Sequence, residues 1–256
     1  MRTGIDYHIH TFYQKCGNET LTVPAIIERA KAHYLTSIAI TDHLNSFDML
    51  ENFRLIKLDI EQVETDLEVW FGAELNFMGC DGDWPYNESI RDEYGFRIAI
   101  GGIHSDFTDT QDPIELIDIQ HRHHMRTLTD PLVDVLVHPY WFGDPDFDKR
   151  TTDWWDRLME EFPEDRITEL AQASAEHRTA IEANCAAIFY CPRYSNRFKA
   201  AYVEFLRKLA AKGALFTTGS DAHDIKEIGI STYAEGVLDG IGVPESQIWR
   251  PSGRAT

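Results

Sequence analysis

The chain has 256 residues, 24 basic and 43 acidic side chains, and a formal net charge of -19 at pH 7. This length is typical of one α/β barrel, so we expect a single domain over residues 1–256. An acidic surface repels polyphosphate chains and anionic membranes, which argues against long nucleic acids and membranes as partners. A small phosphorylated molecule remains compatible with this charge if bound cations concentrate positive charge at one point.

The location is predicted from what the sequence lacks. We see no signal peptide, no run of about eighteen apolar residues, and no disulfide framework among the four cysteines. A cytoplasmic protein is therefore expected.

Seven short, mostly apolar stretches alternate with helical stretches along the chain. The predicted strands cover residues 5–10, 37–41, 68–74, 96–104, 133–138, 180–184 and 215–221. Helices are predicted near residues 22–33, 48–63, 113–127, 154–162, 166–177 and 196–212, with a polar, turn-rich insertion at 80–95 and a loop at 141–153. Strands that alternate with helices in this way predict a parallel α/β fold, here a seven-stranded (β/α) TIM-like barrel.

Each predicted strand ends near a residue that can bind a metal ion or orient another residue that does. These residues are His8, His10, His43, Glu74, His104, His138, Glu182, Asn184, Asp221 and His223. Active sites of parallel barrels lie at the C-terminal ends of the strands, so we expect these side chains to meet at one mouth. A lone histidine at a strand end is more often a hydrogen-bonded structural residue. Many imidazoles in one buried mouth, however, are costly without cations to accept their lone pairs, and the joint pattern predicts a polynuclear metal site.

The other histidines receive structural interpretations. His121, His123 and His124 follow one another on a predicted helix whose 3.6-residue period leaves them partly exposed, so we predict a solvated face. His33 and His177 precede strands, at the end of the barrel opposite the mouth.

The ordered motifs H-x-H, T-D-H, G-x-E, G-x-x-H, H-P and G-S-D-A-H resemble those of the PHP family, named for polymerase and histidinol phosphatase domains. The resemblance extends from Asp6 to about Trp249. From G-S-D-A-H through E-I-G-I to a helix near Tyr233, the chain is especially similar to stand-alone histidinol-phosphatase-like members. The resemblance implies a distorted seven-stranded barrel, a cluster of two or three divalent Zn, Mn or Fe ions, and hydrolysis of phosphate esters.

The resemblance also implies a division of the ligands among three ions. One ion would be held by His8, His10, Glu74 and Asp221, a second by His104 and His138 with Glu74 bridging, and a third by His43 and His223. The family usually completes the third set with a His or Asp from the loop after H-x-H, where this chain has Y-Q-K-C-G.

Two residues of that loop are candidates, and they imply different chemistry. A Cys16 thiolate would ligate the ion and favour Zn or Fe over Mn. Lys15 would instead bind a substrate oxygen or replace the third ion's charge. The alternative is that neither Lys15 nor Cys16 has a role in the site and both are ordinary loop residues.

Arg193 and Arg197 follow the strand that carries Glu182, where similar members place basic residues that contact phosphate. Their forked donors suit a terminal phosphate, although arginines that begin a surface helix give the same pattern. Glu182 and Asn184 alternate on one strand, and we assign them to orienting ligands or to hydrogen bonds with substrate.

The function expected from these residues is a metal-dependent phosphoesterase, acting on a small-molecule phosphate monoester through attack of a metal-bound hydroxide. Glu74, Asp221 and His223 are its predicted catalytic residues, and no residue stands out as the general acid. The alternatives are a phosphodiesterase or short-oligonucleotide nuclease, an amidohydrolase, and a catalytically silent metal-binding regulatory barrel. The sequence does not predict the oligomeric state.

Overall fold

The computed structural model describes residues 4–77, 82–105, 108–143 and 147–252. Its strands are β1 (Ile5–Ile9), β2 (Ser37–Ile40), β3 (His43–Leu44), β4 (Glu68–Asn76), β5 (Ile98–Gly102), β6 (Val135–Leu136), β7 (Ala180–Asn184) and β8 (Phe216–Gly219). They are parallel and follow the order β1-β2-β4-β5-β6-β7-β8, with the short β3 paired to β4. The seven predicted strands are confirmed, and β3 adds a two-residue strand that pairs His43 with Glu74.

The barrel closes incompletely between β8 and β1. An isolated bridge joins Ile9 to Ala222, and the N–H of Asp221 donates to the carbonyl of His8 over 2.8 Å. Oδ1 of Asp6 accepts the N–H of Ser220 over 2.8 Å, so a side chain replaces part of the ladder. The distorted TIM-like barrel is confirmed, and its irregular seam lies beside the predicted ligands of β1 and β8.

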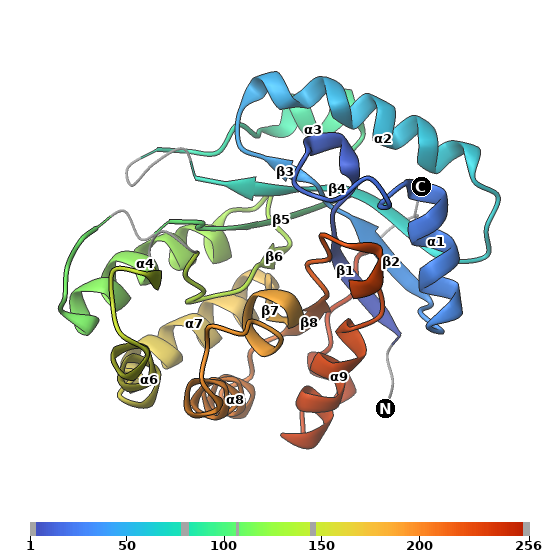
Figure 1. The fold of residues 1–256 in the computed structure, drawn as a ribbon. Helices are drawn as coiled ribbons and strands as arrows, with labels where there is room; N and C mark the ends of the chain where they lie inside the picture. Colours follow the sequence, from blue (N-terminus) through green and yellow to red (C-terminus); the bar gives the residue numbers. More distant parts are fainter. Residues whose placement is uncertain (1–3, 78–81, 106–107, 144–146, 253–256) are drawn as a thin grey trace.

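Helices surround the strands, with α1 and α2 beside β1 to β4 and α4, α7, α8 and α9 beside the later strands (Figure 1). Their bounds are α1 Val23–Ala32, α2 Leu50–Gln62, α3 Glu88–Tyr94, α4 Pro113–Thr129, α6 Thr152–Glu160, α7 Glu164–His177, α8 Asn196–Ala211 and α9 Ser231–Gly240. Side-chain caps begin several of them. Thr22 accepts the N–H of Ala25 before α1, and Ser195 accepts that of Phe198 before α8.

The insertion predicted to be turn-rich contains helix α3, so that prediction is wrong for residues 88–94. Asn87 caps the helix by accepting the N–H of Ile90, and Gly95 ends it with a φ of +75°. These two residues resemble turn residues in the sequence, yet they are the N-cap and C-cap of a short helix. Positions 80 and 81 of the insertion, and 144–146 of the predicted loop, lie outside the described residues.

The interior of the barrel is apolar below the predicted site. Tyr7, Trp70, Ile98 and Ile100 belong to one buried cluster. Trp70 and Glu74 lie four residues apart on β4 and therefore on the same face of the strand. The carboxylate consequently lies above a layer of apolar side chains, away from water.

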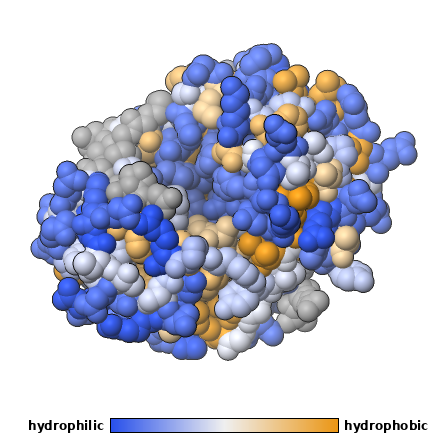
Figure 2. All heavy atoms as spheres, in the orientation of Figure 1, coloured by the Kyte–Doolittle hydropathy of each residue, from blue (hydrophilic) through white to orange (hydrophobic). Residues whose placement is uncertain are grey.

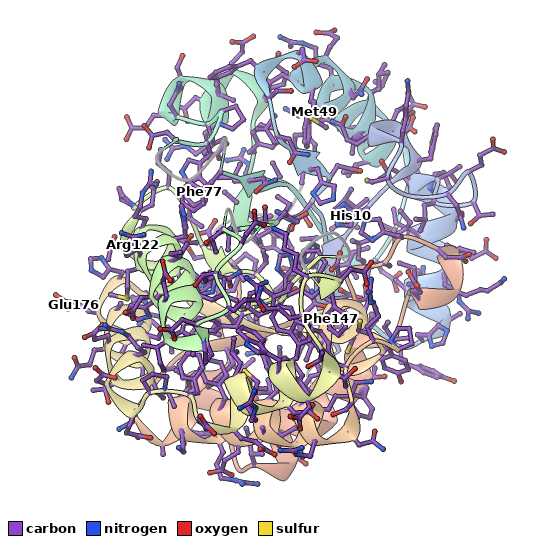
Figure 3. The ribbon with its side chains drawn as sticks, turned by 60° about the vertical axis from the view of Figure 1, so that its left-hand side comes forward. His10, Met49, Phe77, Arg122, Phe147 and Glu176 are labelled. Atoms are coloured by element: carbon purple, nitrogen blue, oxygen red, sulfur yellow. The ribbon has the colours of Figure 1, made fainter. Side chains whose placement is uncertain are left out.

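The solvated face predicted for the histidines of α4 is wrong. His121, His123 and His124 are buried, with exposed fractions of 5%, 3% and 1%. Arg122, which lies between them, is exposed. Figure 3 shows it projecting outward from α4, whereas His10 lies in the interior. α4 packs against α7 as well as β6, so more than one stripe of this helix is covered.

Hydrophilic side chains cover most of the face shown in Figure 2, and apolar ones are scattered among them. Among the helices of the described residues, none has both the length and the apolar character needed to cross a membrane.

Two glycine substitutions test the packing of the barrel. A Cβ at Gly72 would lie against the carbonyl oxygen and Cγ2 of Ile98 on β5, whereas a Cβ at Gly236, exposed on α9, has no atom within 4 Å. We expect Gly72→Ala to lower the free energy of unfolding by about 1–3 kcal/mol, because backbone atoms cannot yield. Gly236→Ala should raise it by about 0.5–1 kcal/mol through helix propensity.

Denaturant unfolding of both variants beside wild type measures the two changes. A Gly72→Ala protein as stable as wild type would contradict the close strand packing.

Candidate metal centre

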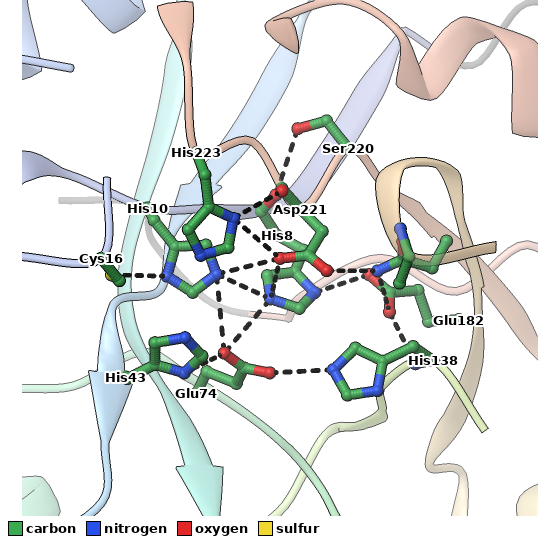
Figure 4. A network of polar contacts seen from close by, with 12 residues as sticks. His8, His10, Cys16, His43, Glu74, His138, Glu182, Ser220, Asp221 and His223 are labelled. Carbon is green, nitrogen blue, oxygen red and sulfur yellow. Dashed lines mark hydrogen bonds and ion pairs between the residues drawn. The ribbon is translucent and has the colours of Figure 1, made fainter. Parts of the chain in front are cut away.

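A buried carboxylate, Glu74 of β4, lies at the centre of the strand ends (Figure 4). Five imidazoles approach it, those of His8, His10, His43, His104 and His138. Its Oε1 lies 2.9 Å from Nε2 of His104 and 3.1 Å from Nε2 of His138. Its Oε2 lies 2.6 Å from Nδ1 of His43, and 3.4 and 3.5 Å from Nε2 of His8 and His10. The structure thus brings together residues that are up to 130 positions apart in the sequence.

A second carboxylate, Asp221, approaches the same imidazoles from the end of β8. Its Oδ1 lies 3.2 Å from Nε2 of His10 and 3.4 Å from Nε2 of His8. The ring of His223 stacks on that of His10 with a centroid distance of 4.2 Å. Asp221 has a φ of +56°, a backbone conformation that is uncommon for residues with a Cβ and that is held here by the hydrogen bond to His8.

The donor set fits divalent cations. Nδ1 of His8 lies 2.9 Å from Oε1 of Glu182, which only accepts, so Nδ1 carries a proton and Nε2 is the nitrogen that faces Nε2 of His10, at 3.1 Å. Nδ1 of His43 lies 2.6 Å from Oε2 of Glu74, so a second imidazole nitrogen faces this carboxylate. Imidazole nitrogens and carboxylate oxygens that converge in this way are the ligand types that divalent transition-metal ions bind.

The charges of the site point the same way. Burial opposes ionisation of Glu74, but His43, His104 and His8 outweigh it and hold the pKa of Glu74 well below its usual value. Burial and the neighbouring His43 lower the pKa of His10 to about 3. A neutral imidazole is in the form that binds metal. Burial also opposes protonation of His8 and His43, but Asp221 beside His8 and Glu74 beside His43 outweigh it and raise their pKa, so these two rings would release a proton on binding an ion.

Three groups of side chains place their ligand atoms within 4.8 Å of one another. They are His8, His10 and Glu74; then His43, Glu74 and His104; and finally His10, Cys16, His43 and His223. Glu74 belongs to two of the groups, so it is placed to bridge neighbouring ions.

The structure separates the two candidates of the loop after H-x-H. Sγ of Cys16 lies 3.9 Å from Nδ1 of His10, inside the third group. Burial and the neighbouring Asp42 raise the pKa of the Cys16 thiol to about 12, so the thiol needs a cation to become a thiolate. Lys15 ends a short 3-10 helix with a φ of +62°, and its side chain is exposed and outside this group.

Buried polar side chains hold the ligand residues in place. Oε1 of Glu182 contacts His8, while its Oε2 accepts the N–H of His138 over 2.8 Å and the amide of Asn184 over 3.0 Å. Asn184 also donates to Oδ2 of Asp221 over 3.3 Å. Glu182 and Asn184 therefore contact predicted ligand residues on β1, after β6 and after β8.

A cavity of about 570 Å³ opens above the cluster. His43, His104, His138, Asp221 and His223 form its metal-facing side, and Trp141, Phe142, Tyr190 and Ile230 are among its walls. Sequence reasoning missed Trp141 and Tyr190 as wall residues. The only sequence features that could have indicated them are the position of Trp141 in H-P-Y-W-F, three residues after His138, and that of Tyr190 directly before C-P-R.

The two predicted arginines lie in different places. Arg193 lines the cavity, pairs with Asp148, and lies 4.4 Å over the ring of Phe147. Arg197 instead points to another groove, where it pairs with Glu160 over 2.7 Å and with Asp153 over 3.1 Å. The structure does not bring Arg197, predicted to bind substrate, to the cavity, because acidic residues of α6 pair with it elsewhere.

Comparison with known proteins places the chain in a family. The model of the PHP domain matches residues 6–186. A protein named probable phosphatase from Vibrio atlanticus is 26% identical over 97% of this chain and 89% of its own length. A second protein named probable phosphatase, from Enterobacter sp., is also 26% identical, over 95% of this chain and 88% of its own length.

A solved structure shares the fold. Histidinol phosphate phosphatase from Lactococcus lactis, crystallised with zinc, L-histidinol and phosphate, superposes with a TM-score of 0.63 at 18% identity, covering 94% of this chain and 95% of its own. The ligand motifs, the barrel and the match over residues 6–186 agree, and the chain belongs to the PHP domain family.

Proposed function

We propose that this protein is a metal-dependent phosphatase that hydrolyses a small-molecule phosphate monoester at a site of two or three divalent transition-metal ions. The observation that carries the proposal is the convergence of five imidazoles on the buried Glu74 carboxylate beneath an open cavity. The names of the relatives support a phosphatase, and the zinc in the Lactococcus lactis structure supports the metal.

The residues are assigned to three ions as follows. His8, His10, Glu74 and Asp221 hold the first, His104 and His138 share the second with Glu74, and His43, His223 and Cys16 hold the third. A thiolate ligand favours Zn or Fe over Mn in that third position. Because the ligands come from the first strand to the last, we also propose that the whole chain acts as one domain.

Bound divalent ions would lower the pKa of water and neutralise phosphoryl charge. Glu74, Asp221 and His223 are the proposed catalytic residues because they hold these ions beside the cavity. Arg193 supplies a guanidinium at the cavity wall, and its forked donors suit a terminal phosphate dianion. Trp141 and Tyr190, which line the cavity, would shield the reacting group from water.

A cavity of about 570 Å³ suits a small molecule rather than a polymer. The net charge of -19 also disfavours nucleic acid strands, so we favour a monoesterase over a diesterase or nuclease. The family favours a phosphatase over an amidohydrolase. The cytoplasmic location stays a prediction.

The first prediction concerns metal content. Wild-type protein purified without chelator and reconstituted with Zn or Mn should hold at least two ions per chain by elemental analysis. His104→Ala should hold about one fewer and lose at least the 10–100-fold in activity that loss of an outer-shell partner typically causes. His177→Ala, which removes an exposed histidine at the end of α7, is the matched control and should match wild type. Wild type with less than one ion per chain would refute the metal site.

The second prediction concerns Cys16. Cys16→Ala should lower the metal content by about one ion, because it removes a ligand of the third group, and Cys16→His should restore it with a shift towards Mn. Cys191→Ala, which removes a thiol from the cavity wall, should leave the content unchanged. If Cys16→Ala binds as much metal as wild type, Cys16 is a packing residue.

The third prediction concerns Arg193. Arg193→Ala should raise KM for a phosphate monoester about tenfold or more without changing metal content, since a charge-assisted hydrogen bond to the dianion is lost. Arg197→Ala is the control, because its guanidinium lies in another groove, and its KM should stay that of wild type. Faster hydrolysis of a diester or of single-stranded DNA than of any monoester would refute the monoesterase.

A further inference from the structure

The chain leaves regular structure directly after β6. This strand ends at Leu136, and the segment of residues 138–142 that follows has positive φ at His138 (+26°) and at Tyr140 (+58°). The segment carries His138, a proposed metal ligand, and Trp141, a wall of the cavity. Its backbone conformation therefore sets the position of an ion and the shape of the substrate cavity together.

Side chains satisfy most of the backbone of this segment, and one backbone hydrogen bond, from the N–H of Trp141 to the carbonyl of His138 over 3.0 Å, closes the turn. Glu182 accepts the N–H of His138, Tyr202 donates to the carbonyl of Pro139, His124 accepts the N–H of Tyr140, and Tyr194 accepts the N–H of Phe142, over 2.8 to 3.1 Å. Buried backbone groups need such partners, so each of these side chains restricts the segment.

His124 on α4 is the partner at the residue with the larger positive φ. Its Nε2 lies 3.1 Å from the backbone nitrogen of Tyr140, and its ring packs edge-on against the Tyr140 ring with centroids 4.5 Å apart. Burial, followed by the neighbouring His121, lowers the pKa of His124 well below its usual value, so the imidazole is neutral and Nε2 offers a lone pair.

The same helix also holds the other end of Tyr140. The phenol lies 3.1 Å from Nδ1 of His121, whose Nε2 lies 2.7 Å from Oε2 of Glu169 on α7. Because the carboxylate accepts, the proton sits on Nε2, and Nδ1 accepts the phenol proton. Tyr140 is thus fixed at its backbone and at its side chain by two histidines one helical turn apart.

We propose that His124 is a positioning residue of the metal centre, which fixes the turn at Tyr140 and thereby the place of the ligand His138 and of the cavity wall Trp141. The proposal rests on the proposed function, since it takes His138 as a ligand. His124 does not line the described cavity, and it acts through the backbone of the segment.

The test compares substitutions that keep or remove the acceptor. In His124→Gln the amide oxygen reaches about as far as Nε2 and can accept the N–H of Tyr140. In His124→Asn the same amide is one methylene shorter and falls short, and His124→Leu has no acceptor. His123→Leu is the matched control, because His123 is equally buried on the same helix but packs against Phe77.

Each full-length variant is loaded with Co²⁺, and we would measure its visible absorption, the rate at which a chelator removes the metal, kcat/KM for a phosphate monoester, and circular dichroism. We expect His124→Leu and His124→Asn to release Co²⁺ about 10–100-fold faster than wild type, to change the absorption spectrum and to lose activity by a similar factor. His124→Gln and His123→Leu should stay near wild type. If His124→Leu does not fold, the comparison of His124→Gln with His124→Asn tests the proposal without it.

The inference is overturned if His124→Asn keeps the release rate and spectrum of wild type, or if His123→Leu loses as much as the variants of His124. Wild-type protein that takes up no Co²⁺ would instead refute the metal-dependent phosphatase itself, so the two failures are distinguishable.

Discussion

The structure depends on one constraint, the need of a buried carboxylate for positive charge. Glu74 is fully buried above an apolar layer, where an isolated carboxylate is costly. The five imidazoles around it cannot all supply charge by protonation, since burial and His43 lower the pKa of His10 to about 3. Divalent cations would satisfy the carboxylates and the imidazoles together. They would also leave net positive charge for the proposed phosphate dianion, despite the acidic surface.

Positive φ values recur where the strand ends meet this cluster. His138, Tyr140 and Asp221 all have them, and none is a glycine. Such backbone is held by its surroundings: Asp221 by a hydrogen bond to His8, and Tyr140 by His124. The irregular seam between β8 and β1 has the same origin, because regular pairing would carry the strands past the points where their ligands converge.

The sequence predicts which side chains meet at the strand ends better than it predicts the burial and the partners of the residues around them. Strand periodicity and the position of barrel active sites were enough to identify Glu74 and the histidines around it, because both are properties of the fold. Cys16 and Lys15 are adjacent, and only the left-handed turn at Lys15 shows which of them faces His10. The position of Arg197 away from the cavity could not be predicted, because its partners Glu160 and Asp153 are distant in sequence. His124 was misassigned because the helical period assumes one buried stripe, whereas α4 is covered on two sides.

Two side chains outside the ligand groups link the proposed ions to the rest of the molecule. Glu182 contacts His8 and His138, which we assign to different ions, so its carboxylate fixes the distance between them from inside the barrel. His124 fixes the same segment from the outer layer of helices. The spacing of the proposed ions therefore depends on residues that bind none of them. For this reason a list of ligand motifs predicts that metal binds here, but the number of ions has to be measured.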